Sequence, residues 1–395
     1  MIARIFVWII LLITLPDLYI YVHFFHHRTR PLRWWAALLW GFVSIGMIAY
    51  TIGLASVKSF IPDHYAWIEV YLFLVGIFVN PKVVFALCSW VGAGWCRLRH
   101  TQVNQGNRVG AILAGLTILV FVYGMTIGPR KLRVTHQDLY FRDLPSRFEG
   151  YKIVQFSDAH VGTFNHFMDS TLARDVDSII AQRADLICFT GDLVDTRASE
   201  VYPCRSVLAR LTRKSGAPVY SILGNHDYSI YLGVSPVKKK ENEKELQHLE
   251  RQLGWRLLMN QHAVIRRGKD SIVIGGEENE GSRRFPKKSD LPKTLEGVGS
   301  HAFLIMLQHD PTAWDDSILP CSHAQLTLCG HTHAGQINIF GLRPSRLVYR
   351  EDYGLYEKEG RYLYVSAGLG GLIPFRFGAT PDIVVFTLHR GPAGR

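Results

Sequence analysis

Several uninterrupted apolar stretches in the first 129 residues restrict the possible fold more than any other feature of the chain. Three of them, at about 1–25, 34–55 and 109–128, could each cross the hydrocarbon core of a bilayer as a helix. A helix rises about 1.5 Å per residue and the core is roughly 30 Å thick, so about 20 apolar residues suffice. We therefore expect a transmembrane region over residues 1–129.

A fourth apolar stretch, 65–95, is longer and is interrupted by Asn80, Pro81 and Lys82. Because proline breaks the helical hydrogen-bond ladder, we predict one kinked crossing, with Lys82 reaching toward the membrane interface. The alternative is two segments that meet at the proline. In total we expect about four transmembrane helices, with the carboxylate of Asp17 facing the helix bundle rather than lipid.

The first apolar stretch differs from a cleaved signal peptide, because it lacks a basic n-region and a small-residue cleavage site. The orientation in the membrane stays open. Loops 26–33 and 97–108 contain three arginines each, but five Lys or Arg residues flank the spans on the opposite side, so the positive-inside rule does not decide.

The net charge of +11 is divided into +6 for residues 1–129 and +5 for residues 130–395. The bias in the second part fits an ordinary solvated surface, or affinity for an anionic substrate or anionic lipid headgroups. The chain has no stripe of interleaved basic and aromatic residues, which argues against a nucleic-acid partner.

Six cysteines are spread along the chain without a Cys-x-x-Cys pair, which argues against a zinc ribbon or a redox dithiol. Cys188 and Cys329 lie within apolar runs and are expected to be buried. Cys204 and Cys321 could pair in an oxidising compartment, and the sequence leaves this open.

From about residue 134 onward, short strand-like runs alternate with helix-like segments, which predicts an α/β domain over residues 130–395. Five of the apolar runs stop at Asp, Asn or His. They are YKIVQFSDAH (151–160), ADLICFTGDLVD (184–195), PVYSILGNHD (218–227), HAFLIMLQHD (301–310) and AQLTLCGHTH (324–333). Ligand sites in α/β sheets lie beyond the carboxyl ends of the strands, so we expect these polar residues to converge.

The chemistry of these five endings indicates a metal site. Each ending alone would be an ordinary turn or helix cap, but together they are rich in imidazole and carboxylate. Such donors suit manganese, iron or zinc rather than a soft thiolate-bound metal. A carboxylate shared by two cations would place them about 3.5–4 Å apart, the separation used by two-metal hydrolases.

The same blocks, in this order, resemble the calcineurin-like metallophosphoesterase superfamily. Its pattern is Asp-x-His, Gly-Asp-x-x-Asp, Gly-Asn-His-Asp/Glu, a lone His, and Gly-His-x-His; here the blocks are SDAH, GDLVD, GNHD, QHD and GHTH. The resemblance covers about residues 134–390. The linker YFRDLPSRFEGYKIVQFSDAHVG and the ending GLYEKEGRYLYVSAGLGGLIPFRFG are similar to the membrane-associated or exported bacterial phosphodiesterases. The resemblance implies a four-layer sandwich, in which two mixed β-sheets are flanked by helices.

The resemblance also implies two divalent metal ions (Mn, Fe or Zn) and a set of residues that would hold them. The first metal would be held by Asp158, His160, Asp192 and His333, and the second by Asp192, Asn225, His309 and His331, with Asp192 as the bridge. His226 would be the general acid, Asn225 and His226 would bind the substrate, and Asp195 would orient His226. No ligand position is substituted in this chain.

In function, the resemblance implies hydrolysis of a phosphodiester or pyrophosphate bond by attack of a metal-bridging hydroxide, with His226 as the general acid. A lipid-linked substrate is favoured because the domain is tethered to a bilayer. One alternative is a non-catalytic membrane sensor or scaffold, against which the intact ligand set argues. Another is a nucleic-acid phosphoesterase, for which a basic stripe is lacking.

Two loops could contact the substrate. Loop 280–293 contains Arg283 and Arg284, although it could equally be an ordinary solvated loop. Loop 368–378 contains Phe375 and Arg376, and its apolar residues would either pack in the core or, if exposed, contact lipid.

For location, we expect an integral protein of the bacterial cytoplasmic membrane. Similarity to exported proteins favours the extracytoplasmic face for the catalytic domain. No obligate protein partner is inferred.

Overall fold

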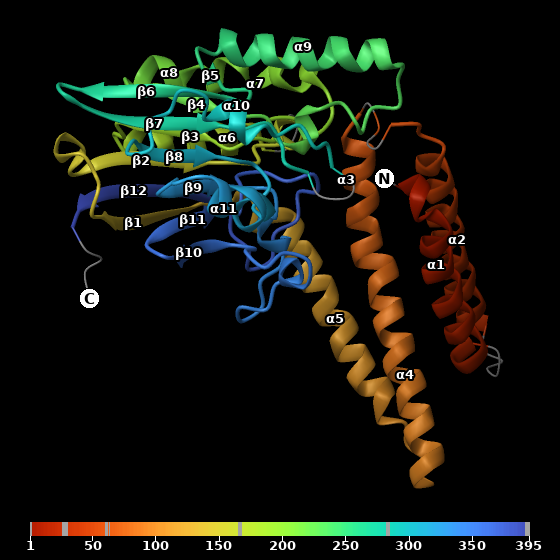
Figure 1. Ribbon diagram of the computed structural model, residues 1–395. Coiled ribbons are helices and arrows are strands. Elements are labelled where there is room, and N and C mark those ends of the chain that lie inside the picture. Colours follow the sequence, from red (N-terminus) through yellow and green to blue (C-terminus); the bar gives the residue numbers. More distant parts are fainter. Residues whose placement is uncertain are drawn as a thin grey trace. The chain divides into compact units, whose positions relative to one another are not determined.

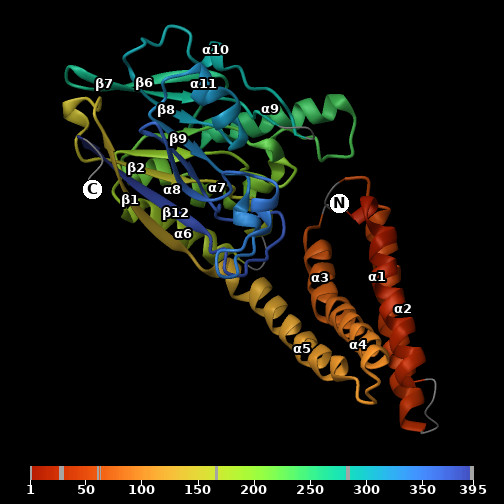
Figure 2. The same cartoon turned by 60° about the horizontal axis from the view of Figure 1, so that its bottom comes forward.

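The computed structural model describes residues 2–25, 31–59, 62, 64–164, 168–281 and 285–391. The chain divides into two compact units, Met1–Ile127 and Gly128–Arg395, which are drawn in Figures 1 and 2 and are described separately below.

The first unit is helical. Its α-helices are α1 (Phe6–Ile20), α2 (Pro31–Ala55), α3 (Ala66–Leu74), α4 (Asn80–Arg99) and α5 (Gln105–Thr126). Short helical turns lie at Ile2–Arg4, Tyr21–Phe25 and Val75–Val79. Four helical stretches are long and apolar enough to cross a membrane: Phe6–Phe25, Trp35–Ala55, Ala66–Arg99 and Gln105–Arg130. The predicted four transmembrane helices are thereby confirmed.

The third of these stretches is a single helical run of 34 residues that contains an irregular turn. The turn Val75–Val79 is π-helical and joins α3 to α4 directly before Pro81, which occupies the first turn of α4. A π-turn widens the helix and removes the need for the amide hydrogen that proline lacks. The structure therefore has one continuous helical stretch over residues 66–99, as predicted, rather than two segments that meet at the proline.

The expectation that Lys82 reaches the membrane interface is wrong. Its side chain is buried, and Nζ donates to Oδ1 of Asp17 at 2.6 Å and to Oγ of Ser44 at 2.9 Å. Nε1 of Trp40 donates to the same Asp17 oxygen at 2.8 Å. Asp17 faces the bundle as expected, and it provides the internal counter-charge that makes snorkelling by Lys82 unnecessary.

The second unit contains two six-stranded mixed sheets, with strand orders β1-β12-β2-β3-β4-β5 and β10-β11-β9-β8-β7-β6. The strands of the first sheet are β1 (Arg133–Phe141), β12 (Asp382–Arg390), β2 (Tyr151–Phe156), β3 (Leu186–Phe189), β4 (Val219–Ser221) and β5 (Arg256–Leu257). Those of the second are β10 (Gly354–Lys358), β11 (Arg361–Val365), β9 (Leu326–Cys329), β8 (Phe303–Leu307), β7 (Asp270–Gly276) and β6 (Gln261–Arg267).

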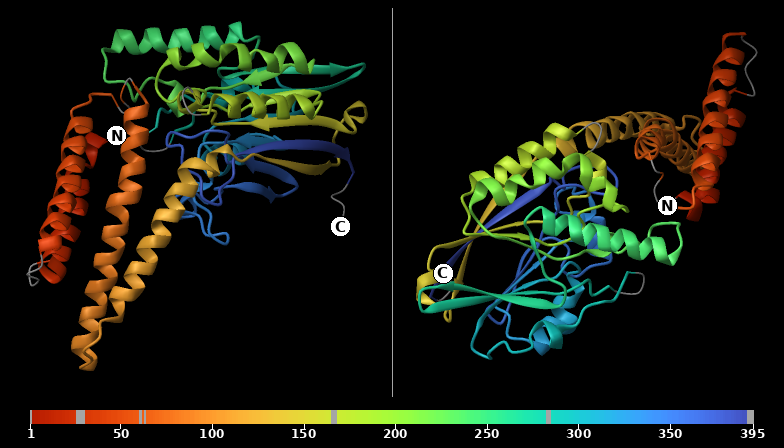
Figure 3. Two further views of the ribbon diagram at one scale, coloured as in Figure 1. Left: turned by 180° about the vertical axis from the view of Figure 1, so that it is seen from behind. Right: turned by 90° about the horizontal axis from the view of Figure 1, so that it is seen from above.

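Helices cover the outer faces of the two sheets (Figure 3). They are α6 (Asp169–Ala181), α7 (Val201–Leu208), α8 (Arg210–Ser215), α9 (Pro236–Gln252), α10 (Leu291–Thr294) and α11 (Leu319–Cys321). Short turns lie at Gly128–Arg130, Ser146–Phe148, Val161–Phe164, Ala198–Glu200, Asn225–Asp227, Trp314–Ile318, His333–Gly335 and Pro344–Leu347.

Alternating side chains along each strand build separate core layers. In β2, Val154 and Phe156 pack toward the helices of the first sheet, whereas Ile153 packs toward the second sheet. The core between the sheets also contains Leu186 of β3 and Ile305 of β8. This period of two, with apolar residues on both faces, produces the expected helix–sheet–sheet–helix sandwich.

The structure describes all six cysteines and contains no disulfide between them. Cys188 and Cys329 are buried as expected, and Cys204 and Cys321, whose pairing the sequence left open, do not form a disulfide.

Candidate metal centre

Five strands direct their carboxyl ends to one region of the sandwich. Strands β2, β3 and β4 run parallel as neighbours in the first sheet, and β8 and β9 do so in the second. The five polar endings predicted from the sequence follow these five strands. Five of the candidate residues are at most 2% exposed: Asp158, His160, Asp192, Asn225 and His309. The side chains of His331 and His333 are 5% and 16% exposed, so the centre is more accessible at these two residues.

The loops that carry these residues adopt an unusual backbone conformation. Five non-glycine candidates have positive φ angles: Asp158 (48°), His160 (44°), Asp192 (58°), His331 (74°) and His333 (52°). Such conformations cost roughly 1–3 kcal/mol each and persist where the surrounding structure enforces them, often at functional sites. The strain identifies these turns as a site before any ligand is considered.

Glycines allow the loops to approach one another closely. A Cβ atom on Gly330 would lie 2.0 Å from Oγ of Ser157 and 2.3 Å from Oδ2 of Asp158. A Cβ atom on Gly224 would lie 2.2 Å from Oδ1 of Asp192. The glycine that precedes the histidines of GHTH, and the one that precedes Asn225, are therefore required for convergence.

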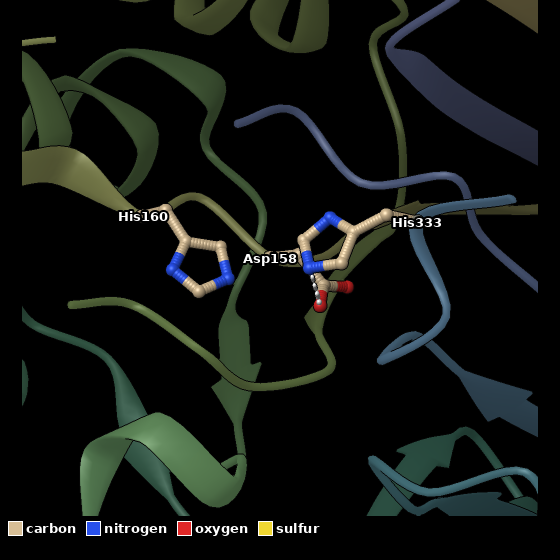
Figure 4. Close-up of side chains that lie close together, drawn as sticks. All are labelled: Asp158, His160 and His333. Atoms are coloured by element: carbon tan, nitrogen blue, oxygen red, sulfur yellow. Dashed lines mark ion pairs between the residues drawn. The ribbon is translucent and has the colours of Figure 1, made fainter. Parts of the chain in front are cut away.

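One group of side chains consists of Asp158, His160 and His333, whose donor atoms all lie within 4.8 Å of one another. Figure 4 shows the Asp158 carboxylate next to the ring of His333, with the ring of His160 to one side of them. Nε2 of His333 is 3.4 Å from Oδ1 of Asp158. Two of these residues follow β2 and the third follows β9, so the group joins the two sheets.

A second group consists of Asp158, Asp192 and His309, again within 4.8 Å of one another. Nε2 of His309 is 3.1 Å from Oδ2 of Asp192, and Nε2 of His160 is 3.6 Å from the same oxygen. This carboxylate oxygen thus lies next to an imidazole of each expected ligand set, which is the position that a shared ligand needs. Asp158 belongs to both groups.

Asn225 and His331 lie beside the second group. The amide oxygen of Asn225 is 2.7 Å from Nδ1 of His331 and 3.1 Å from Nε2 of His309. Nε2 of His331 is 2.8 Å from the hydroxyl of Tyr349. The four residues expected to hold a second metal are therefore brought together.

The electrostatics of the centre favour neutral imidazoles at His160 and His331, and an ionised Asp192 paired with a protonated His309. Burial lowers the pKa of His160, and it lowers the pKa of His331 to about 4. Burial acts against ionisation of Asp192, but the nearby His309 and His226 hold its pKa well below the ordinary range. For His309, burial is outweighed by Asp192, which raises the pKa of the imidazole to about 10.

These residues fit divalent cations. Nε2 of His160 is buried and has no hydrogen-bond partner, although it faces Oδ2 of Asp192. A buried imidazole nitrogen without a partner is costly, and coordination to a cation would satisfy it. Imidazole, carboxylate and amide oxygen are also the donor types that manganese, iron and zinc accept.

His226 and Asp195 lie at the same site, but the expectation that the Asp195 carboxylate orients His226 is wrong. The carboxylate of Asp195 accepts a hydrogen bond from Nδ1 of His160 at 2.9 Å. Nδ1 of His226 instead donates to the main-chain carbonyl of Asp195 at 2.7 Å. The carboxylate therefore orients His160, because that buried ring lies within its reach, while the main chain of the same residue orients His226.

Asp227 is a structural residue of the site. Its carboxylate accepts hydrogen bonds from the amides of Asp192 (2.9 Å), Leu193 (3.0 Å), Val194 (3.3 Å) and Gly224 (2.8 Å). One side chain thereby holds the loop after β3 against the loop after β4.

Aromatic residues that the sequence did not single out also contact the centre. Tyr231 stacks on His226 with the ring centroids 4.3 Å apart and accepts a hydrogen bond from Asn225 at 2.9 Å. Phe285 packs edge-on against His331 at 4.8 Å. Tyr231, Phe285 and Tyr349 follow no motif spacing, so sequence reasoning had no signal with which to find them.

The remaining candidates for substrate binding are either buried or lie outside the described residues. Arg376 is 2% exposed, and its guanidinium donates to the main-chain carbonyls of His333 (3.0 Å) and Gly370. It therefore supports the loop that carries His333. Phe375 is buried at 8% exposure, and Arg283 and Arg284 lie outside the described residues.

Comparison with known proteins assigns both units. Residues 151–335 match the family described as Calcineurin-like phosphoesterase, and residues 3–129 match a probable transmembrane domain of calcineurin-like phosphoesterases. The uncharacterized metallophosphoesterase YkuE of Bacillus subtilis is 31% identical over 291 residues, which cover 71% of this chain and 94% of that protein. The chain belongs to the calcineurin-like phosphoesterase family.

Two further relatives extend the comparison. A transmembrane protein with metallophosphoesterase domain from Danio rerio is 29% identical over 320 residues, covering 78% of this chain and 69% of that protein. The UDP-2,3-diacylglucosamine pyrophosphatase LpxG of Chlamydia trachomatis is 28% identical over 325 residues, covering 67% of this chain and 92% of that protein. This member of the calcineurin-like phosphoesterase family is thus an integral membrane protein with a metal-dependent phosphoesterase domain.

Proposed function

We propose that the protein hydrolyses a phosphodiester or pyrophosphate bond at a centre of two divalent cations. The observation that carries the proposal is the convergence of two carboxylates, four imidazoles and one amide oxygen at the ends of five strands. These donors are more than one cation needs. Oδ2 of Asp192 also lies next to an imidazole of each proposed ligand set, His160 in the first and His309 in the second.

The proposed first set is Asp158, His160, Asp192 and His333, and the proposed second set is Asp192, Asn225, His309 and His331. Cations bound there would polarise the phosphoryl oxygens and activate a water for in-line attack on phosphorus. Hydrogen bonds within the chain orient two of the imidazoles. Nδ1 of His160 donates to Asp195, and Nδ1 of His309 donates to the carbonyl of Thr190 at 2.7 Å, so each ring turns Nε2 toward Asp192.

His226 is the proposed general acid. Its Nδ1 is held by the carbonyl of Asp195, which leaves Nε2 as the nitrogen that can donate to a leaving oxygen. Burial lowers the pKa of His226 to about 4, so the ring is neutral at pH 7 before substrate binds. An anionic phosphoester beside the ring would raise this pKa, so that Nε2 takes up a proton from water and can then donate it to the leaving oxygen.

A lipid-linked substrate is the proposed substrate class. The chain is anchored by four candidate spans, and the Chlamydia trachomatis relative is named as a pyrophosphatase of a diacylated nucleotide sugar. We further propose that the protein resides in a bacterial cytoplasmic membrane with the catalytic unit on the extracytoplasmic face. Hydrolysis of a charged chromogenic diester by intact cells, compared with permeabilised cells, tests this side.

The function is tested with the purified full-length protein after removal of metals by a chelator. Activity toward an aryl phosphodiester, an aryl phosphomonoester and a long-chain lipid pyrophosphate is measured with added manganese, iron or zinc. We expect metal-dependent hydrolysis of the diester or the pyrophosphate, and its loss in His226→Ala without loss of metal binding. A folded protein that binds metal but hydrolyses none of these compounds would instead favour a sensor or scaffold.

A further inference from the structure

The segment between His333 and Tyr349 exposes a group of large apolar side chains. The exposed fractions are 44% for Ile339, 102% for Phe340, 74% for Leu342, 90% for Leu347 and 75% for Val348. These five residues are called the apolar turn below. Large apolar side chains exposed together on one short segment of a folded domain are typical of an interaction site.

The tip of the apolar turn has a defined conformation. Ile339 and Leu342 exchange two main-chain hydrogen bonds of 3.0 and 2.9 Å. Between them, Phe340 and Gly341 have φ angles of 51° and 87°, as in the two-residue turn of a β-hairpin. Phe340 is therefore presented at the end of an ordered turn.

The base of the apolar turn is fixed by buried polar contacts. Arg343 forms a two-point ion pair with Asp352, with N–O distances of 2.6 and 2.8 Å. Ser345 also donates to Asp352 at 2.8 Å. The exposed side chains thus project from a segment that is itself well anchored, and the exposure belongs to the folded conformation.

The apolar turn is continuous with the metal centre. The chain leaves the centre at His333 and returns at Tyr349, whose hydroxyl is 2.8 Å from Nε2 of His331. Both ends of the segment therefore contact the residues of GHTH. A surface that binds the apolar turn would lie at the rim of the centre.

The base of the apolar turn lies near the first residue of the catalytic unit, Gly128, which directly follows the helical unit in the chain. A Cβ atom on Gly128 would lie 1.8 Å from the carbonyl oxygen of Arg376. The next residue, Phe377, accepts a hydrogen bond from the amide of Asn338 at 2.8 Å. Residues 376 and 377 therefore contact both the first residue of the catalytic unit and the residue that precedes the apolar turn.

We propose that the apolar turn inserts into the boundary between headgroups and acyl chains of the membrane in which the protein is anchored. The exposed Arg346 lies among the apolar residues, and a mixture of apolar and basic side chains suits a surface with anionic lipids. The rim of the metal centre would then lie at the lipid surface. The class of substrate that follows, a lipid whose phosphoester lies at headgroup depth, rests on the proposed function; the insertion itself does not.

Depth-dependent quenching tests the insertion in the full-length protein, reconstituted in nanodiscs of phosphatidylcholine and phosphatidylglycerol. An environment-sensitive fluorophore is attached at Phe340→Cys or Leu347→Cys, after Cys88, Cys96 and Cys321 have been replaced by serine. The matched control is Val264→Cys, which is 45% exposed on β6, at the opposite edge of the second sheet from β10. Brominated acyl chains should quench the labels at 340 and 347 at least about twofold more than the label at 264.

Two results would overturn the insertion. Labels at 340 and 347 that are as accessible to water as the label at 264 would show that the apolar turn stays outside the bilayer. Labels that are shielded from water equally in detergent and in lipid, without quenching by bromine, would show that a protein surface covers the apolar turn.

The consequence for substrate is tested with the double variant Phe340→Asp/Leu347→Asp. Hydrolysis of a long-chain lipid pyrophosphate in the nanodisc should fall about tenfold or more, while hydrolysis of a soluble aryl diester should not change. Equal rates on the lipid for parent and variant would contradict the role in substrate access. If the parent hydrolyses neither compound, the proposed function fails, and the quenching result stands independently.

Discussion

At the scale of single residues, the centre depends on groups that hold the imidazoles in one orientation. Asp195 and the carbonyl of Thr190 accept the Nδ1 protons of His160 and His309. The carbonyl of Asp195 does the same for His226. For His160 and His309 the hydrogen bond selects the tautomer in which Nε2 has a lone pair for a cation. For His226 it leaves Nε2 as the nitrogen that can bind and release a second proton.

Removal of the Asp195 carboxylate should weaken metal binding. We expect Asp195→Ala to lower the affinity for manganese about ten- to hundredfold, because His160 loses the acceptor that orients it. Asp195→Asn keeps an acceptor oxygen and should lose less. Metal titration by calorimetry gives both values, and an unchanged affinity in the alanine variant would contradict the orienting role.

Replacement of Asp227 should destabilise the catalytic unit. In Asp227→Asn, an amide nitrogen would face main-chain N–H groups that now donate to a carboxylate oxygen, among them those of Asp192 and Gly224. An unsatisfied buried donor costs about 1–3 kcal/mol, and this loss is expected in thermal unfolding. The control is Asp270→Asn, because the partly exposed Asp270 accepts hydrogen bonds from Ser146 and Arg147 through one oxygen that an asparagine can replace. Equal stability of the two variants would contradict the account.

At the scale of elements, the helices of the first unit are joined by an internal ion pair as well as by apolar packing. Lys82 of α4 donates to Asp17 of α1 and to Ser44 of α2. Trp40 of α2 also donates to Asp17. Three helices thus share one polar cluster. Within lipid such groups cannot exchange their partners for water, which gives the cluster a role in fixing how the helices pack.

Breaking this pair from one side should be costly. Lys82→Met or Asp17→Leu alone leaves a buried charge without its partner, for which about 3–5 kcal/mol is expected. The double variant removes both charges and should recover most of the lost stability. Unfolding of the purified protein in mild detergent measures the four stabilities, and additive losses in the double variant would show that the two residues do not interact.

At the scale of the whole molecule, the sequence predicted the features that depend on periodicity and on strand ends. Four spans follow from apolar length, and the convergence of residues such as Asp158 and His309 follows from parallel strands that end at one edge. Individual side-chain contacts between segments far apart in the chain could not be predicted. The pairing of Lys82 with Asp17 and the contact of Asp195 with His160 depend on which side chain lies nearest after folding.

Sequence patterns also could not predict which loop exposes its apolar side chains. Loop 368–378 was a candidate for lipid contact, yet Phe375 in it is buried against the rest of the unit. The exposed apolar side chains lie instead on the loop between β9 and β10, with Phe340 at the tip of its hairpin turn. Both loops are rich in glycine and apolar residues, and only tertiary packing distinguishes them.

The central claim is that the five strand ends hold two divalent cations, and anomalous X-ray scattering from crystals of the manganese-loaded protein tests it most directly. We expect two anomalous peaks about 3.5–4 Å apart. Asp192 should lie between them, and the imidazoles of His160, His309, His331 and His333 should be directed at them. A catalytically active, metal-loaded protein whose anomalous peaks lie away from these residues would contradict the account.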